Sequence, residues 1–123
     1  MTLANLDVAS HDGILIVSVA GEIDLSNADD IRDQVVEAIG TAHDRVALDL
    51  TGTTYLDSTG VRLLFDLATR MQARRRKLAL VVTDRAIVRR VIVLTKLDEA
   101  VPVHASLGEA VAELSRSESA GPV

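Results

Sequence analysis

Tyr55-Leu56-Asp57-Ser58-Thr59-Gly60-Val61 is the stretch that decides the fold of this chain. An apolar segment at 46–50 leads into it, as expected of a buried strand, and apolar residues at helical spacing follow, namely Val61, Leu64, Phe65, Ala68 and Met71. The sequence therefore predicts a strand, a loop and a helix, with Ser58 at or beside the first helical turn. The N–H groups of a first turn have no intrahelical partner and carry the positive end of the helix dipole, so an added phosphate is tolerated there.

A β-hairpin and a helix are predicted upstream of this stretch. Residues 6–10 and 14–20 alternate in polarity around His11-Asp12-Gly13, a turn-forming trio. Apolar residues between 28 and 39 then keep helical spacing. The expected ends of this helix are a cap at Ser26 or Asn27 and a stop at Gly40.

Strands and helices also alternate downstream. Residues 78–82 are almost all apolar and predict a buried strand. Residues 91–93 also fit a strand, but the arginines around them supply a polar face and favour a helix. The expected elements are the strand 78–82, a helix over 87–94 capped by Asp84, a short strand over 100–104 and a last helix over 107–114 capped by Ser106.

The order of these elements predicts an α/β fold with a mixed sheet of four to five strands. The hairpin is antiparallel, whereas the later strands need crossover helices and are parallel. About four helices of modest length would pack mainly on one face of the sheet and leave the other less covered. We expect one domain over residues 1–116 and a flexible tail over 117–123, which is rich in Ser, Gly and Pro.

Composition limits the classes of function. The 123 residues are 48% hydrophobic but only 2% aromatic, which predicts an aliphatic core, and without Cys there is no disulfide, thiolate metal site or cysteine nucleophile. A net charge of −5 and few aromatic rings disfavour nucleic acid as a partner. We find neither a signal peptide nor an apolar run long enough for a bilayer, and so predict a cytoplasmic protein that does not bind membranes.

The residues give little support for catalysis. His11, His43 and His104 are scattered, so neither a metal site nor a serine hydrolase triad is predicted, and the phosphate-binding glycine motifs are absent. Glu22 and Asp24 lie at strand spacing and point to one side, but a solvated loop pair explains them more simply. We therefore predict no enzyme activity, no catalytic residue and no cofactor.

Asp49 suggests an alternative, because phosphorylated receiver domains carry an Asp at the end of such a strand. Receivers also need an acidic pair after the first strand and a Lys after a later one. Thr83-Asp84-Arg85 contains no Lys, and the opening hairpin differs from a receiver's start. The simpler interpretation is that Asp49 binds loop amides, as Leu56 anchors the loop in the core. The cluster Arg74 to Lys77 is interpreted as a solvated helix end.

Three segments together resemble the STAS domain family, above all its stand-alone bacterial anti-sigma factor antagonists. They are Gly21-Glu22-Ile23-Asp24, the strand 46–50, and Asp57-Ser58-Thr59-Gly60-Val61. The resemblance covers about residues 5–115 and implies a mixed four- to five-stranded sheet with helices largely on one face. It also implies that Ser58 is phosphorylated by an anti-sigma factor with serine-kinase activity, and that a PP2C-type phosphatase removes the phosphate.

The resemblance implies that the unmodified chain binds the anti-sigma factor and frees the sigma factor, while ATP belongs to the kinase. The expected partner-binding residues are Glu22, Asp24, Asp57, Ser58, Thr59, Gly60 and Arg62. Thr59, where many relatives have a second serine, is an alternative acceptor. An accessory or scaffold subunit of a stressosome, or of lipid or anion transport, is the alternative function. A weak homodimer is left open.

Overall fold

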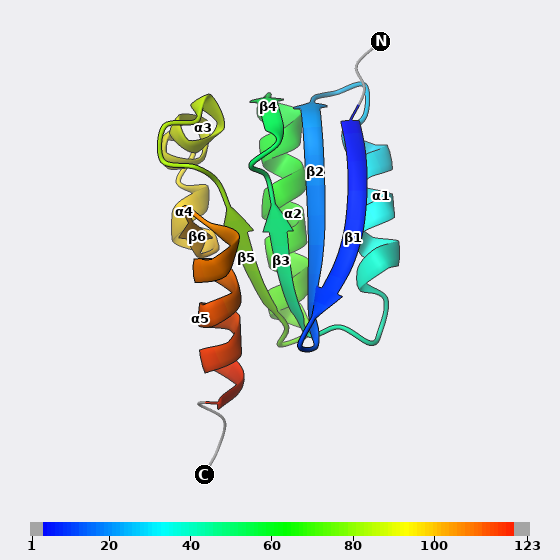
Figure 1. Ribbon diagram of the computed structural model, residues 1–123. Coiled ribbons are helices and arrows are strands. Elements are labelled where there is room, and N and C mark those ends of the chain that lie inside the picture. The colour runs from blue at the N-terminus through cyan, green and yellow to red at the C-terminus, as the bar shows by residue number, and fades with distance from the viewer. Residues whose placement is uncertain (1–3, 120–123) are drawn as a thin grey trace.

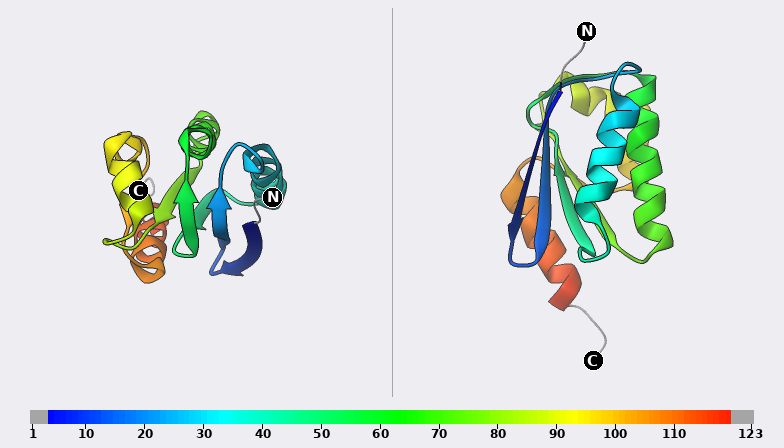
Figure 2. Two further views of the ribbon diagram at one scale, coloured as in Figure 1. Left: turned by 90° about the horizontal axis from the view of Figure 1, so that it is seen from above. Right: turned by 90° about the vertical axis from the view of Figure 1, so that its right-hand side faces the viewer.

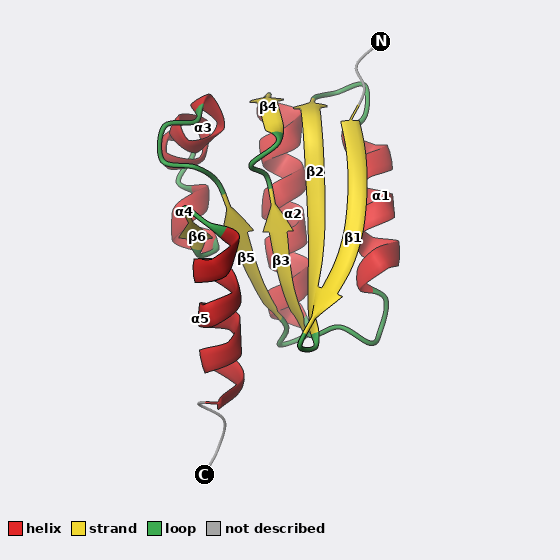
Figure 3. Ribbon diagram, viewed as in Figure 1, coloured by secondary structure: helices red, strands yellow, loops and turns green. Residues whose placement is uncertain are grey.

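Six strands and five helices make up residues 4–119, the part of the chain that the computed structural model describes (Figure 3). In chain order they are β1 (Ala4–His11), β2 (Ile14–Ile23), α1 (Ala28–Ile39), β3 (Arg45–Asp49), β4 (Thr53–Leu56), α2 (Ser58–Ala73), β5 (Lys77–Val81), α3 (Ile87–Leu94), α4 (Leu97–Ala100), β6 (Val103–His104) and α5 (Leu107–Ser119). None of these described helices has both the length and the apolar character needed to cross a bilayer.

The strands form one mixed sheet in the order β1-β2-β3-β5-β6, and β4 pairs with β2 off this path. β1 and β2 are the predicted antiparallel hairpin, and every other pairing is parallel. β2 is long enough to pair with β3 along its first half and with β4 near its end, where the register shifts between Gly21 and Glu22. The carboxyl ends of β2, β4 and β5 consequently lie at the same end of the molecule (Figure 1).

Helices cover the two faces of the sheet unequally. α1 and α2 pack on one face, α5 packs against β3 and β5 on the other, and α3 and α4 lie beyond β5 at the side (Figure 2). Side chains alternate accordingly: Val46, Leu48 and Leu80 belong to the core under α1 and α2. Ala47 and Ala79 belong to the smaller core under α5. The core is aliphatic, as predicted, since Tyr55 is exposed and Phe65 only partly buried.

Four of the predicted helix ends can be compared with the structure. Gly40 ends α1, and the Ser106 hydroxyl accepts a hydrogen bond from Glu109 N at the start of α5 (3.2 Å), as predicted. Asn27 is the N-cap residue of α1, but its side chain makes no capping bond. The prediction for Asp84 was wrong, because α3 begins after Ala86 and Asp84 instead forms an ion pair with Arg89 (3.6 Å).

The sheet has one strand more than the predicted maximum, because 53–56 forms β4 and not a loop. The predicted strand 100–104 is reduced to Val103–His104, and the segment before it forms the extra helix α4. The helical interpretation of 87–94 is confirmed. α5 continues to Ser119, so 117–119 are helical and the rest of the predicted tail lies outside the described residues.

Candidate functional site

Ser58 is the first residue of α2 and its side chain is exposed. Asp57 is the N-cap: its Oδ1 accepts a hydrogen bond from Gly60 N (2.9 Å), and its backbone carbonyl accepts the first helical bond, from Val61 N (2.9 Å). The start of α2 lies beside the end of β4 and the β2–α1 loop (Figure 1). The Ser58 hydroxyl is thus presented to solvent at the positive end of a 16-residue helix.

Asp57 also ties this helix to a distant loop. Its second carboxylate oxygen accepts a hydrogen bond from Leu25 N (3.1 Å), across 32 positions of sequence. The loop that carries Leu25 is braced from within, since Asn27 accepts from Asp24 N (3.0 Å) and donates to Glu22 O (2.8 Å). Asp24 in turn accepts from Ser26 N (2.9 Å). One carboxylate therefore fixes the β2–α1 loop relative to Ser58.

Gly60 lets the first turn of α2 lie directly on the sheet. A Cβ there would lie 2.5 Å from Leu56 Cδ1 and 3.1 Å from both Cγ2 and O of Ile23. Leu56 is buried, as predicted for the anchor of this loop. Close packing at Gly60 thus sets how near the first turn of α2 lies to Leu56 and Ile23, and with it the position of Ser58.

The structure divides the predicted partner-binding residues into two neighbouring places. Asp24 and Asp57 line an open hollow between the β2–α1 loop and β4, together with Leu25, Ser26 and Tyr55. Thr59 and Arg62 instead line a groove between α1 and α2, with Ala28, Asp29, Arg32, Leu63, Asp66 and Arg70. Glu22 and Ser58 are exposed, whereas Gly60 is buried, which suits packing and not direct contact.

Leu25 and Tyr55 were not predicted as site residues. Leu25 is 78% exposed and Tyr55 is 47% exposed, although both are large and apolar. The available signal was the leucine inside the otherwise polar segment 24–27, and the single tyrosine of the chain. Their exposure adds apolar surface to a hollow that Asp24, Ser26 and Asp57 also line, and a mixture of apolar and polar groups suits a protein partner.

Asp49 and the three histidines do not join this site. The Asp49 carboxylate accepts from Thr51 N (3.0 Å) and Thr51 Oγ1 (2.8 Å), so it binds its own loop as predicted. Among the side chains that the structure describes, no group of three or more His, Asp or Glu could hold a metal ion.

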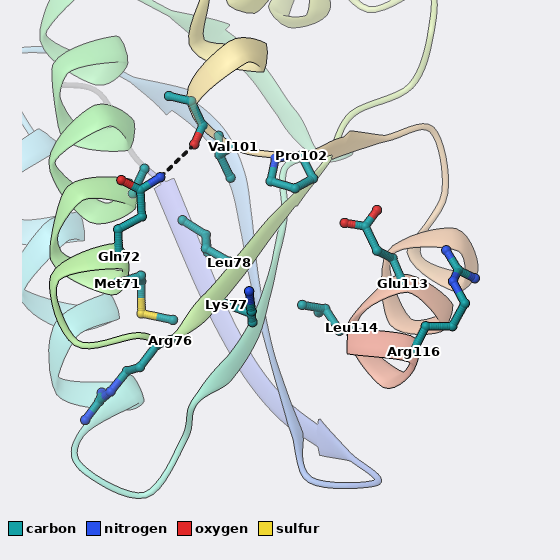
Figure 4. A pocket seen from close by; sticks show the side chains of 12 residues that line it. Met71, Gln72, Arg76, Lys77, Leu78, Val101, Pro102, Glu113, Leu114 and Arg116 are labelled. Atoms are coloured by element: carbon teal, nitrogen blue, oxygen red, sulfur yellow. Dashed lines mark hydrogen bonds between the residues drawn. The ribbon is translucent and has the colours of Figure 1, made fainter. Parts of the chain in front are cut away.

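A cavity of about 450 Å³ lies at the other end of α2 (Figure 4). Met71, Gln72 and Leu78 line it between α2 and α5, and Gln72 Nε2 donates to Ala100 O (3.3 Å). The arginine-rich end of α2 is at the same place, where Arg76 donates to Gly40 O (2.8 Å). The two ends of α2, Ser58 and Ala73, are fifteen helical steps or about 22 Å apart, so the cavity is not part of the Ser58 site.

Replacing Asp57 with Ala tests the role of this carboxylate. We expect the free energy of unfolding to fall by about 1–2 kcal/mol, because a helix cap and a loop contact are lost together. Amide hydrogen exchange at Leu25 and Gly60 should accelerate, since both N–H groups lose their acceptor. Asp49→Ala is the matched control, because it removes a carboxylate bound to Thr51 and should leave the Leu25 amide unchanged. An unaltered rate of amide exchange at Leu25 in Asp57→Ala would rule out the hydrogen bond between Leu25 N and the Asp57 carboxylate.

The fold and the site define a mixed α/β domain that presents a serine on the first turn of a helix. The STAS domain family model matches residues 5–110. Two relatives from Mycobacterium tuberculosis are named anti-sigma-F factor antagonists: RsfB is 29% identical over 104 residues, covering 85% of this chain and 84% of RsfB. RsfA is 30% identical over 99 residues, covering 79% and 77%.

A solved structure described as an anti-sigma factor antagonist from Mycobacterium paratuberculosis is also similar. It superimposes with a TM-score of 0.80 at 26% identity, covering 92% of this chain and 95% of that one. The chain therefore belongs to the STAS domain family, as its three segments predicted.

Proposed function

We propose that this chain is an anti-sigma factor antagonist controlled by phosphorylation of Ser58. In the unmodified state it binds an anti-sigma factor with serine-kinase activity and releases the sigma factor, and a PP2C-type phosphatase restores that state. The names of the relatives RsfB and RsfA support the antagonist role. The exposed position of Ser58 on the first turn of α2 carries the assignment of the switch. Sigma factors act in the cytoplasm, which is where we place this protein.

In this proposal the chain is a substrate and a binding partner, not an enzyme. The kinase supplies ATP, and the serine hydroxyl accepts the γ-phosphoryl group. The site is suited to the added charge, because a phosphate on Ser58 would lie at the helix N-terminus, where each negative charge is stabilised by roughly 0.3–1 kcal/mol. The fold should therefore survive modification, and only the docking surface should change.

A kinase that modifies Ser58 must also bring its nucleotide phosphates to that hydroxyl. After transfer, the phosphoserine and the remaining ADP are like charges at close range, and like charges brought together across an interface cost several kcal/mol. Closing the interface would also remove water from the new dianion. Both effects favour dissociation of the modified chain.

Phosphotransfer from a purified anti-sigma kinase tests this proposal. With ATP we expect one acid-stable phosphate per chain, mapped to Ser58 by mass spectrometry, and no transfer to Ser58→Ala. Thr59→Ala should still be modified, because Thr59 is partly buried and lines the α1–α2 groove while Ser58 is exposed. Modification of Ser58→Ala at Thr59 would shift the switch to that residue. An acid-labile phosphate on Asp49 would favour the receiver alternative.

A further inference from the structure

α3 is apolar on both of its faces. Its sequence, Ile-Val-Arg-Arg-Val-Ile-Val-Leu, buries Val88 and Ile92 completely against the domain. Ile87, Val93 and Leu94 nevertheless remain 73%, 51% and 75% exposed. At 100° per residue these three and the exposed Arg90 lie within about one third of the helix circumference, opposite the buried side. We call Ile87, Arg90, Val93 and Leu94 the α3 outer stripe.

Such a stripe is unusual for a helix on the surface. A helix that is apolar all round is normally buried, and a group of exposed large apolar side chains marks an interaction site, whereas single ones do not. Of the seven large apolar side chains that are exposed in the described part of the chain, three belong to this stripe. Two more, Leu25 and Tyr55, line the hollow beside Asp57.

The stripe lies at the same end of the molecule as Ser58. α3 packs against β4, the strand that carries Tyr55 and leads into Asp57. In Figure 1, α3, β4, the end of β2 and the β2–α1 loop follow one another along that end of the molecule. One partner of ordinary size could therefore cover both places, since an interface of standard size involves about 20–30 residues on each side.

The two places differ in charge. The surface around Ser58 is acidic, through Glu22, Asp24 and Asp57. α3 contains no acidic residue, and both Arg85 before it and Arg90 within it are exposed. The nearby Asp84 forms an ion pair with Arg89. A segment that covers the stripe should thus combine apolar side chains with carboxylates. A symmetric contact with a second copy is disfavoured, because it would bring the arginines of both copies together.

We propose that the α3 outer stripe is a second docking surface, which binds an acidic, apolar segment of the same anti-sigma factor that docks at Ser58. This inference rests on the proposed function. Phosphorylation of Ser58 leaves the stripe unchanged, so the stripe supplies affinity that both forms of the chain share. It would keep the kinase close during phosphotransfer, while the Ser58 surface decides between the bound and the released state.

The test is calorimetric titration of the purified anti-sigma kinase with the double variant Ile87→Ser/Leu94→Ser. We expect the Kd to rise about tenfold or more, because two central apolar contacts are lost. The melting temperature should hardly change, since both side chains are largely exposed. Should the serines disturb the helix, Ile87→Ala/Leu94→Ala removes the same contacts with better helix formers. Val8→Ser is the matched control, an apolar side chain 51% exposed on the opposite edge strand, and should bind normally.

Charge gives an independent measurement. Arg90→Glu should weaken binding more than Arg90→Gln, and the difference should shrink as salt is added. Equal affinity of the double variant and the parent chain would overturn the inference. The inference would also be overturned if the parent chain, but not the double variant, sedimented with vesicles containing phosphatidylglycerol. Dimerisation of the parent chain alone would overturn it too, since either result identifies a different occupant of the stripe. If Ser58→Asp binds as tightly as the parent chain, the proposed function is wrong. If Ser58→Asp binds weakly while the stripe variants bind normally, only the second docking surface is wrong.

Discussion

Replacing Ser58 with Asp should weaken binding of the anti-sigma factor about a hundredfold while leaving the melting temperature almost unchanged. The substitution places a carboxylate on the first turn of α2, where an acidic residue is compatible with the helix dipole. Within the interface the same carboxylate must lose water, and the exclusion of water strengthens its repulsion from the neighbouring Asp57, which solvent screens in the free chain. Two unit charges about 6 Å apart repel by roughly 3 kcal/mol at an effective dielectric constant of about 20. The measurement is the Kd by calorimetry, beside thermal unfolding of the free chain.

The controls separate the position of the charge from its mere addition. Thr41→Asp makes the same exchange of hydroxyl for carboxylate at an exposed turn after α1, at the opposite end of the molecule, and should bind normally. Ser58→Ala should bind like the parent chain, because in the proposed function the hydroxyl is needed for modification and not for docking. A normal Kd for Ser58→Asp would show that charge at this position does not control association.

Gly60→Ala should lower the free energy of unfolding by about 1–3 kcal/mol, a fall in melting temperature of about 4–12 °C for a domain of this size. Alanine is the better helix former, so propensity alone predicts the opposite sign. The close approach of Leu56 and of the Ile23 carbonyl decides the outcome, because the new Cβ cannot fit without moving the helix start. Binding should weaken as well, since Ser58 is displaced with that turn.

Gly108→Ala is the matched control for this prediction. Gly108 also lies in a first turn, that of α5, but a Cβ there would have no neighbour nearer than Ser106 Oγ at 4.0 Å. The same exchange should therefore stabilise the chain by about 0.5–1 kcal/mol. Equal effects at both positions would mean that close packing at Gly60 does not limit the first turn of α2.

The sequence was sufficient where the pattern is local. Local periodicity predicted the hairpin around Asp12-Gly13, the helix after Ser58 and the buried strands 46–50 and 78–82, and each of these elements is present in the structure. Family resemblance then supplied the role expected of Ser58, which no periodicity could supply.

What the sequence did not reveal depends on contacts between distant residues. β4 has only four residues and two of them are exposed, so it becomes a strand only because the end of β2 offers it backbone partners. α4 is a single turn separated from α3 by Lys96, whose backbone is left-handed (φ 63°). The bond from Leu25 N to Asp57 spans 32 residues, and it is this bond that brings Leu25 to the Ser58 surface.

The most direct test compares one sample of the chain before and after stoichiometric phosphorylation at Ser58. The Kd for the purified anti-sigma factor is measured in both states, and phosphatase treatment must restore the first value. We predict that phosphorylation raises the Kd about a hundredfold or more and that dephosphorylation reverses the change. An identical Kd in the two states would contradict control of association by Ser58.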